Sequence, residues 1–151
     1  MTALREAVLA EARAWRGTPY QHQASCRGAG TDCLGLIRGV WRAVYGTEPV
    51  TPPPYDRWPG PDEAERLHDA ARRWLVARPD SAPRTGDVVL LAPHRGAPPT
   101  HCALVSQVEP LRLIHAWWQK SVVDTRMPPG WVIVEDGVFA FPAPRSVTGA
   151  R

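Results

Sequence analysis

The sequence lacks the features that mark membrane-spanning or secreted proteins. Its apolar runs all fall short of the roughly 18 residues needed to cross a bilayer. The start of the chain, from Met1 to Ala14, carries charges throughout instead of a basic end followed by an apolar stretch. We therefore expect a protein that is made in the cytoplasm without a Sec signal of its own and does not insert into membranes.

Lysine is also nearly absent, because Lys120 is the only one, and the net charge of +3 comes almost entirely from arginine. The other basic residues are scattered along the chain instead of gathering in one block. This pattern predicts no nucleic-acid partner. A modest positive charge would still favour the approach to an anionic polymer such as a cell wall.

Cysteine is scarce as well, and Cys26, Cys33 and Cys102 do not show the spacing of a small disulfide-linked domain. Three cysteines cannot all pair with one another, so at least one is free. Together with His101 they are also possible zinc ligands. The six-residue gap between Cys26 and Cys33, and the adjacency of residues 101 and 102, argue against the short C-x-x-C knuckles of structural zinc. We therefore expect no metal and no other cofactor.

What the chain does have is enough apolar material for one core: 44% of its 151 residues are hydrophobic. We expect a single domain over residues 1–142, followed by a frayed tail over residues 143–151. No internal repeat is visible.

The periodicity of the apolar residues changes along the chain. Helical spacing covers residues 3–16, 33–45 and 62–78, and a proline-crowded stretch over residues 49–61 predicts an extended loop. Five short apolar runs follow, separated by Gly and Pro, at residues 87–92, 101–108, 111–118, 122–126 and 131–139. Helices first and a meandering sheet second predict an α+β domain, with the helices packed on an antiparallel sheet of about five strands.

The most informative residue is Cys33, which follows the N-cap candidates Thr31 and Asp32 and so falls in the first turn of a helix. A helix N-terminus stabilises a thiolate through its dipole and its free N–H groups, which makes the sulfur nucleophilic near neutral pH. A thiol placed only for packing would more often lie inside an element. Asp32 most simply caps the helix.

Two histidines on neighbouring predicted strands suit such a nucleophile. His101 begins the strand 101–108, where alternation of faces would direct Cys102 the other way, into the core. A hairpin through Glu109 and Pro110 would bring His115 beside His101. The order Cys, His, His matches a nucleophile, its base and a group that orients the base.

Four blocks of the chain resemble the NlpC family of bacterial cell-wall cysteine peptidases, which are papain-like, and within it the versions found in phage tails and gene transfer agents. The blocks occur in the family's order and are Gly17–Tyr20, Thr31–Leu36, Gly86–Leu90 with Thr100–Val105, and Ile114–Ala116. The sequence departs from the family at Leu34, where serine is usual, and at Cys102-Ala103, where a glycine-containing turn is usual.

The resemblance implies a papain-like fold in which Cys33 is the nucleophile, His101 the general base and His115 the polar third member. It implies that the Tyr20 hydroxyl and Asp32, both close to Cys33, help to bind the oxyanion or the substrate. The implied substrate is the peptidoglycan stem peptide, cut between γ-D-glutamate and diaminopimelate. The implied setting is a phage-like tail particle, with tail or hub proteins as partners, that opens the wall for DNA entry in the periplasm.

Two other functions remain open on sequence grounds. One is a tail or hub structural protein that keeps the fold without the activity. The other is a different amidase or an acyltransferase on the same fold. An enzyme that acts on lipids would need an apolar membrane-binding surface, and the sequence shows none. The loop 49–61, with Tyr55 and Trp58, is long enough to form a lid over the cleft.

Overall fold

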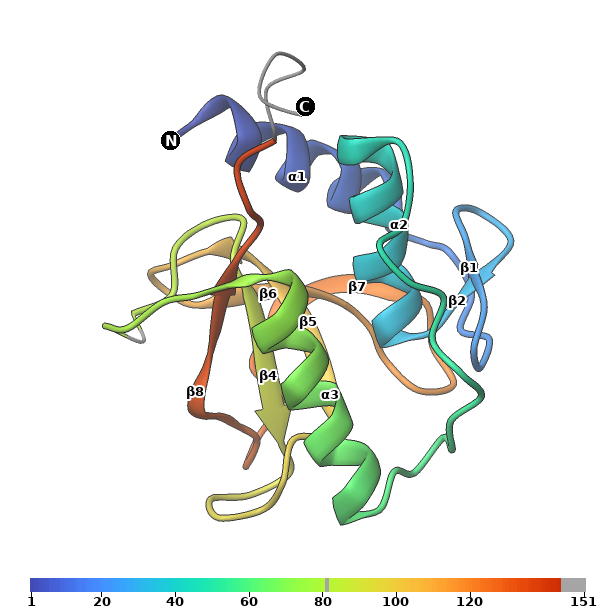
Figure 1. Cartoon of the computed structure of the whole chain (residues 1–151), viewed down its shortest axis with the longest axis vertical. Helices are drawn as coiled ribbons and strands as arrows, with labels where there is room; N and C mark the ends of the chain where they lie inside the picture. Colours follow the sequence, from blue (N-terminus) through green and yellow to red (C-terminus); the bar gives the residue numbers. More distant parts are fainter. Residues whose placement is uncertain (81, 145–151) are drawn as a thin grey trace.

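The computed structural model describes residues 1–80 and 82–144 (Figure 1). Within these residues three helices are present: α1 (Ala3–Ala14), α2 (Cys33–Tyr45) and α3 (Pro61–Trp74). Eight strands accompany them in the same part of the chain: β1 (Ser25–Cys26), β2 (Gly30–Thr31), β3 (Val76–Ala77), β4 (Val88–Ala92), β5 (His101–Gln107), β6 (Arg112–Ala116), β7 (Val122–Arg126) and β8 (Val132–Ala140). The predicted tail 143–151 lies outside the described residues from position 145 onward, and the single domain over residues 1–142 stays a prediction.

The helices begin and end where their capping chemistry dictates. The Thr2 side chain accepts a hydrogen bond from the Arg5 N–H at the start of α1 (3.2 Å). Gly46, in the left-handed conformation with φ of 89°, closes α2. Pro61 opens α3, where a missing N–H costs nothing.

One predicted boundary is wrong: the third helix ends at Trp74 and not at residue 78. Leu75 is extended, and Val76–Ala77 then pair with Ala140 and Phe139 of β8. The edge of the sheet thus gives the backbone of Val76 and Ala77 hydrogen-bond partners in place of those that a longer helix would have supplied. This change also adds a strand to the sheet.

The main sheet has the order β3-β8-β4-β5-β6-β7 within the described residues, and each neighbouring pair is antiparallel. Its six strands compare with the predicted five, and the additional one is β3. The α+β architecture, with helices packed on an antiparallel sheet, is confirmed. The pair β1 and β2, which the sequence pattern missed, forms a small separate ribbon before α2.

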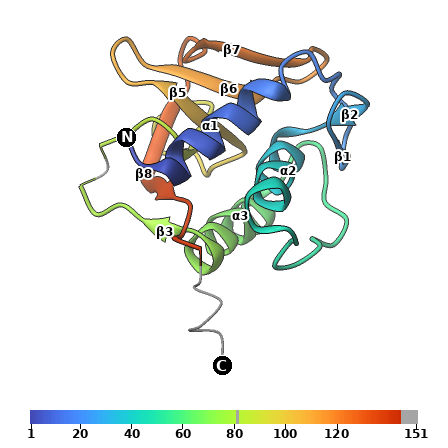
Figure 2. The same ribbon diagram turned by 90° about the horizontal axis from the view of Figure 1, so that it is seen from above.

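The two faces of the sheet bury different sets of side chains, as strand alternation requires. The face toward the helices includes Leu90, Cys102, Leu104 and Ile114, and Figure 2 shows the three helices together on that side of the sheet. The opposite face buries a second cluster: Val89, Leu91, Ala103, Val105, Leu113 and Val138.

Close contacts fix the helices against the sheet. Arg5 of α1 donates to the fully buried Asp87 (2.7 Å) and to the Thr85 carbonyl (2.9 Å) just before β4. Gly39 of α2 lies so close to the ring of Trp15 that a Cβ there would overlap it. These contacts leave the N-terminus of α2 beside the start of β5, which is where the two sequence motifs meet.

Candidate active site

The nucleophile candidate Cys33 is the first residue of α2, as the sequence predicted. Its predecessor Asp32 is the N-cap, and its carboxylate accepts hydrogen bonds from the N–H groups of Gly35 (2.8 Å) and Gln23 (2.7 Å). Gly35 is needed because a Cβ there would overlap the Ala24 carbonyl oxygen and Thr31 Oγ1. The cysteine is therefore held at a helix N-terminus whose first turn packs tightly against the preceding loop.

His101 and His115 meet as expected, across the pair of strands β5 and β6. His101 Nε2 lies 2.8 Å from His115 Nδ1, and His115 Nε2 lies 2.9 Å from Thr125 Oγ1 on β7. The rings of Trp117 and Trp131 pack edge-on against His101, with centroids 5.2 and 5.9 Å away. Three strands and two tryptophans thus hold the histidine pair.

The hydrogen bonds around Thr125 assign the protons of both rings. The Thr125 hydroxyl donates to the Arg126 carbonyl (3.0 Å), so it accepts the Nε2–H of His115. Burial, reinforced by the nearby His101, lowers the pKa of His115 to about 3, which keeps this ring neutral. Its Nδ1 is then an acceptor for the Nε2–H of His101. The remaining nitrogen, His101 Nδ1, carries the free lone pair of a base.

Cys33 lies within hydrogen-bonding reach of both His101 and Cys102 at the start of β5. The Cys102 thiol, which donates to Cys33, and the adjacent His101 hold the pKa of Cys33 well below its usual range, against the opposing effect of burial. The same contact, with burial, raises the pKa of Cys102. Cys33 is therefore the thiolate of the pair and Cys102 the thiol.

Cys102 departs from the sequence interpretation in one respect. It lies on the helix-facing side of the sheet and is 2% exposed, in line with a packing residue. However, the start of α2 approaches β5 on that same face, so Cys102 also contacts the nucleophile. Periodicity could place Cys102 in the core but could not show which helix covers it.

Tyr20 lies in the same cleft, held by main-chain bonds from its N–H to the Lys120 carbonyl (2.8 Å). Burial, followed by the charges of Cys33 and Asp32, raises its pKa to about 12. The phenol therefore stays protonated at neutral pH and is available as a hydrogen-bond donor. This position agrees with the role that the sequence resemblance implied.

The Asp32 carboxylate makes several hydrogen bonds within the protein, unlike a carboxylate that is free to bind a substrate. Besides Gly35 and Gln23 it accepts a hydrogen bond from the Tyr55 hydroxyl, and it is 2% exposed. Burial, and then the charge of Cys33, raise its pKa. Its role here is to cap α2 and to hold Tyr55, which the sequence pattern did not single out for this site.

Tyr55 belongs to a segment without regular structure, residues 49–60, which we call the strap. The Tyr55 carbonyl accepts from His22 Nε2 (2.7 Å) and Gln23 Nε2 (3.1 Å), and Trp58 packs edge-on against Trp118 at 5.0 Å. The strap therefore runs along the cleft, as the lid interpretation of this loop required.

The cleft itself has a volume of about 240 Å³. Strap residues supply one wall, and the start of α2 and the loop before it supply the other. The lining residues are Tyr20, His22, Asp32, Cys33, Leu34, Val50, Pro52, Pro53, Pro54, Tyr55, Asp56, Arg57, Pro59, Glu63, Arg66, Leu67, Ala70 and Thr100. Residues of α3 complete the lining, and Cys33 is among the side chains that face this space.

Residues 1–80 and 82–144 contain no group of three or more His, Cys, Asp or Glu side chains placed to hold a metal ion. Cys26, the fourth member of the zinc alternative, is exposed and unpaired. In the same ranges no helix has the length and apolarity to cross a membrane.

No protein-family model and no curated protein matches the sequence. Among solved structures the chain is similar to the NlpC/p60 domain of the peptidoglycan hydrolase SagA, with a TM-score of 0.53 and 25% identity over 81% of this chain and 88% of that one. It is also similar to a lipoprotein-like protein of the NLP/P60 family from Staphylococcus aureus, with a TM-score of 0.59 and 17% identity. That match covers 93% of this chain and 42% of the other.

The fold is therefore the papain-like fold of NlpC/p60 domains. These neighbours support the resemblance to the NlpC family that the sequence blocks carry.

Proposed function

We propose that this protein is a cysteine peptidase of the NlpC type that hydrolyses an amide bond in peptidoglycan stem peptides. The observation that carries the proposal is the relay from Thr125 through His115 and His101 to a thiolate at the N-terminus of α2. The peptidoglycan hydrolase SagA, whose NlpC/p60 domain has a similar fold, supports the choice of substrate.

The reaction follows from the geometry of these side chains. His101 holds the proton that Cys33 has lost, and the Cys33 thiolate attacks the amide carbonyl. Backbone N–H groups at the start of α2 and the Tyr20 hydroxyl stabilise the oxyanion. His101 then donates its proton to the leaving amine, and a water molecule that the same histidine deprotonates releases the thioester.

His115 and Thr125 act through His101. Because His115 accepts the His101 Nε2–H, the base nitrogen of His101 is directed away from His115, which leaves it for Cys33. The neutral His115 ring also makes the bond without adding a second positive charge beside the imidazolium that forms in the reaction.

The proposal also covers the bond that is cleaved and the particle in which the protein acts. We place the scissile bond between γ-D-glutamate and diaminopimelate, and the protein in a phage-like tail that opens the wall for DNA entry. The sequence blocks that resemble the phage-tail members of the family support this setting. The tail or hub proteins of such a particle would be its partners, and the periplasm its place of action.

The test is digestion of purified peptidoglycan, followed by mass spectrometry of the released fragments. Wild type should release cleaved stem peptides, Cys33→Ala should release none, and Cys26→Ala, which alters an exposed free thiol, should match wild type. The fragment masses identify the bond. Absence of cleavage by a folded wild-type protein would contradict the enzyme and favour the structural tail protein.

The setting has its own test. Phage-like particles purified from cells that encode the protein should contain it, as detected by mass spectrometry of the particle fraction. Its absence from intact particles, with the protein present in the cell extract, would contradict the tail assignment and leave the peptidase proposal standing.

A further inference from the structure

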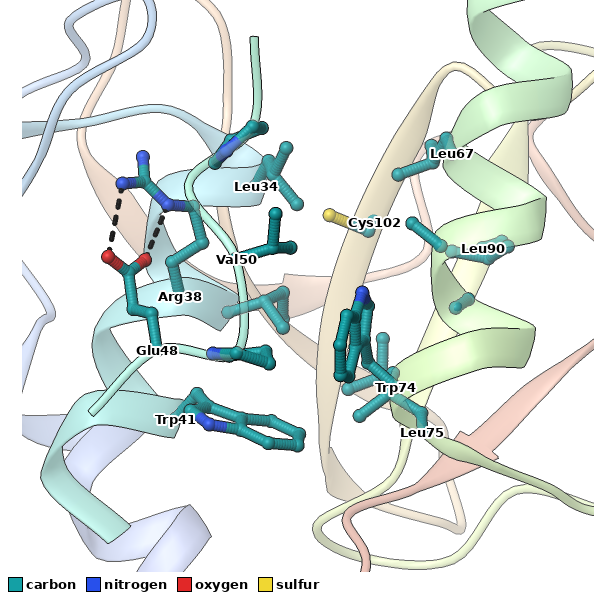
Figure 3. Close-up of a pocket in the computed structure, with 16 residues that line it drawn as sticks. Leu34, Arg38, Trp41, Glu48, Val50, Leu67, Trp74, Leu75, Leu90 and Cys102 are labelled. Atoms are coloured by element: carbon teal, nitrogen blue, oxygen red, sulfur yellow. Dashed lines mark hydrogen bonds and ion pairs between the residues drawn. The ribbon is translucent and has the colours of Figure 1, made fainter. Parts of the chain in front are cut away.

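A second cavity lies behind the nucleophile, on the helix side of the sheet. Its volume is about 130 Å³, and it is a partly open recess bordered by α2, α3, the strands β4 and β5 and the first residues of the strap (Figure 3). The lining residues are Leu34, Ile37, Arg38, Trp41, Glu48, Pro49, Val50, Pro52, Leu67, Ala70, Ala71, Trp74, Leu75, Val88, Leu90 and Cys102.

The lining surface of this cavity is almost entirely apolar. The two charged residues, Arg38 and Glu48, are paired with each other at 2.7 Å, as the dashed lines in Figure 3 show. No charge is therefore left over to bind a polar ligand. An apolar recess of this kind favours the burial of apolar groups from water and offers a polar ligand few partners.

The cavity adjoins the cleft that contains Cys33. Leu34, Val50, Pro52, Leu67 and Ala70 line both spaces. The sulfur of Cys102 lies on the cavity wall, and the same thiol donates to Cys33. The cavity therefore begins at Leu34 and Cys102, the two residues next to Cys33.

We propose that this cavity is a binding subsite for the apolar part of an acyl group that is transferred to Cys33. Its size fits one occupant of about six carbon atoms, because apolar cavities of roughly 150 Å³ stay dry and bind benzene. The chemical class is a short aliphatic or aromatic acyl chain, presented as an ester, thioester or amide. The inference rests on the nucleophile of the proposed function, but it does not depend on the wall substrate.

The step is balanced by groups already described. The Cys33 sulfur bonds to the carbonyl carbon, the bond from that carbon to the leaving oxygen or nitrogen breaks, and the leaving group departs with a proton from His101 where it needs one. Water then hydrolyses the thioester, returns the thiol and releases the carboxylic acid. The acyl chain stays in the cavity through both stages.

Binding in the cavity is tested without an activity assay. The wild-type protein is titrated with benzene, and its methyl resonances are followed by NMR. We expect saturable shifts at Leu34, Leu67 and Leu75. Ala71→Leu, which adds three carbon atoms to a buried residue that lines only this cavity, should abolish them. Unsaturable shifts, or equal shifts in wild type and Ala71→Leu, would overturn the inference.

A second variant covers the case in which Ala71→Leu does not fold. Val50→Phe fills the cavity from the strap, and Val76→Phe makes the same change at an equally exposed valine outside the cavity, since the two are 49% and 50% exposed. Loss of benzene binding in Val50→Phe but not in Val76→Phe supports the site. Loss in both, or in neither, contradicts it.

The acyl role is tested with 4-nitrophenyl acetate and 4-nitrophenyl hexanoate, with Cys33→Ala as the blank. Because each buried methylene adds binding energy, kcat/KM for the hexanoate should exceed that for the acetate at least about tenfold. The ratio should fall toward one in Ala71→Leu and persist in Val76→Phe. A wild-type ratio near one overturns the acyl role even if benzene binds.

The two proposals fail separately. Ester selectivity without peptidoglycan cleavage supports the subsite and contradicts only the wall substrate. If neither ester is hydrolysed although benzene binds, Cys33 is not an acyl acceptor, and the cavity is not a subsite for an acyl group transferred to it.

Discussion

The two walls of the catalytic cleft are built in different ways. One wall is the start of α2 with the loop before it, where backbone bonds and close packing leave little freedom: Gly35 has no room even for a Cβ. The other wall is the strap, residues 49–60, which belongs to no helix or strand and contacts the first wall through Tyr55 and Trp58. The proposed nucleophile, Cys33, is on the rigid wall with the proposed base, His101, beside it, and the strap faces them across the cleft.

The strap also covers polar atoms that it does not satisfy. In the described residues the two buried side-chain atoms without a hydrogen-bond partner are His22 Nδ1 and Trp118 Nε1. Each belongs to a residue that the strap contacts, through Tyr55 and Trp58 respectively. Unpaired buried polar atoms are unfavourable, so this wall should open more readily than the other.

The largest expected effect is on the rigid wall, from His101→Ala. Loss of the base should lower kcat by about 10²- to 10⁴-fold and slow alkylation of Cys33 by iodoacetamide at neutral pH. His94→Ala, at an exposed histidine in a turn, is the matched control and should leave both unchanged. Equal alkylation rates in His101→Ala and wild type would mean that His101 does not activate the thiol.

The next largest effect is on stability and tests how tightly the start of α2 packs against the preceding loop. Gly35→Ala must push the start of α2 away from the Ala24 carbonyl, and overpacking of this kind costs about 1–3 kcal/mol of unfolding free energy. Gly60→Ala, where nothing lies within 4 Å of the added carbon, is the control. Urea denaturation measures both variants, and similar midpoints would contradict the tight packing described here.

Acid stability probes the histidine pair. The pKa of His115 is ordinarily 6.5 and falls to about 3 in the folded protein. Between pH 6.5 and 3, His115 is therefore protonated in the unfolded chain but neutral in the folded one. Stability should therefore fall as the pH drops from 6.5 toward 3, by about 2 kcal/mol at pH 5.

The matched variants for this prediction are His115→Gln and His68→Gln. The first should flatten the dependence of the unfolding free energy on pH, and the second, at a buried histidine bonded to the Asp136 carbonyl, should keep it. An unchanged slope in His115→Gln would show that another group titrates.

The smallest effect belongs to the strap. Tyr55→Phe removes the hydrogen bond to Asp32, so the strap should exchange amide hydrogens and be cut by proteases several-fold faster, with about 1 kcal/mol lost in unfolding free energy. Tyr45→Phe removes a comparable bond to the Pro142 carbonyl (2.5 Å) and should not affect the strap. Unchanged exchange in Tyr55→Phe would show that the strap is as rigid as the opposite wall.

Much of the rigid wall could be predicted from the sequence. The helix start at Cys33, the strand start at His101 and the hairpin that brings His115 to it are local features, set by capping, alternation and turn residues. The edge strand β3 was missed because its two residues have no pattern of their own and are defined only by β8. Thr125 could have been noticed, since it sits on the strand after His115, but many strand threonines are merely exposed.

The sequence by itself determined the α+β order of elements and the local positions of Cys33, His101 and His115 at a helix start and on two adjacent strands, because capping and alternation depend on near neighbours in the chain. Only the tertiary structure decided that Cys102 contacts Cys33, that Tyr55 holds Asp32, and that an apolar recess lies beside Leu34. These features arise where a helix, a strand and an irregular strap meet, and the packing of distant segments against one another is not encoded in the periodicity of any one of them.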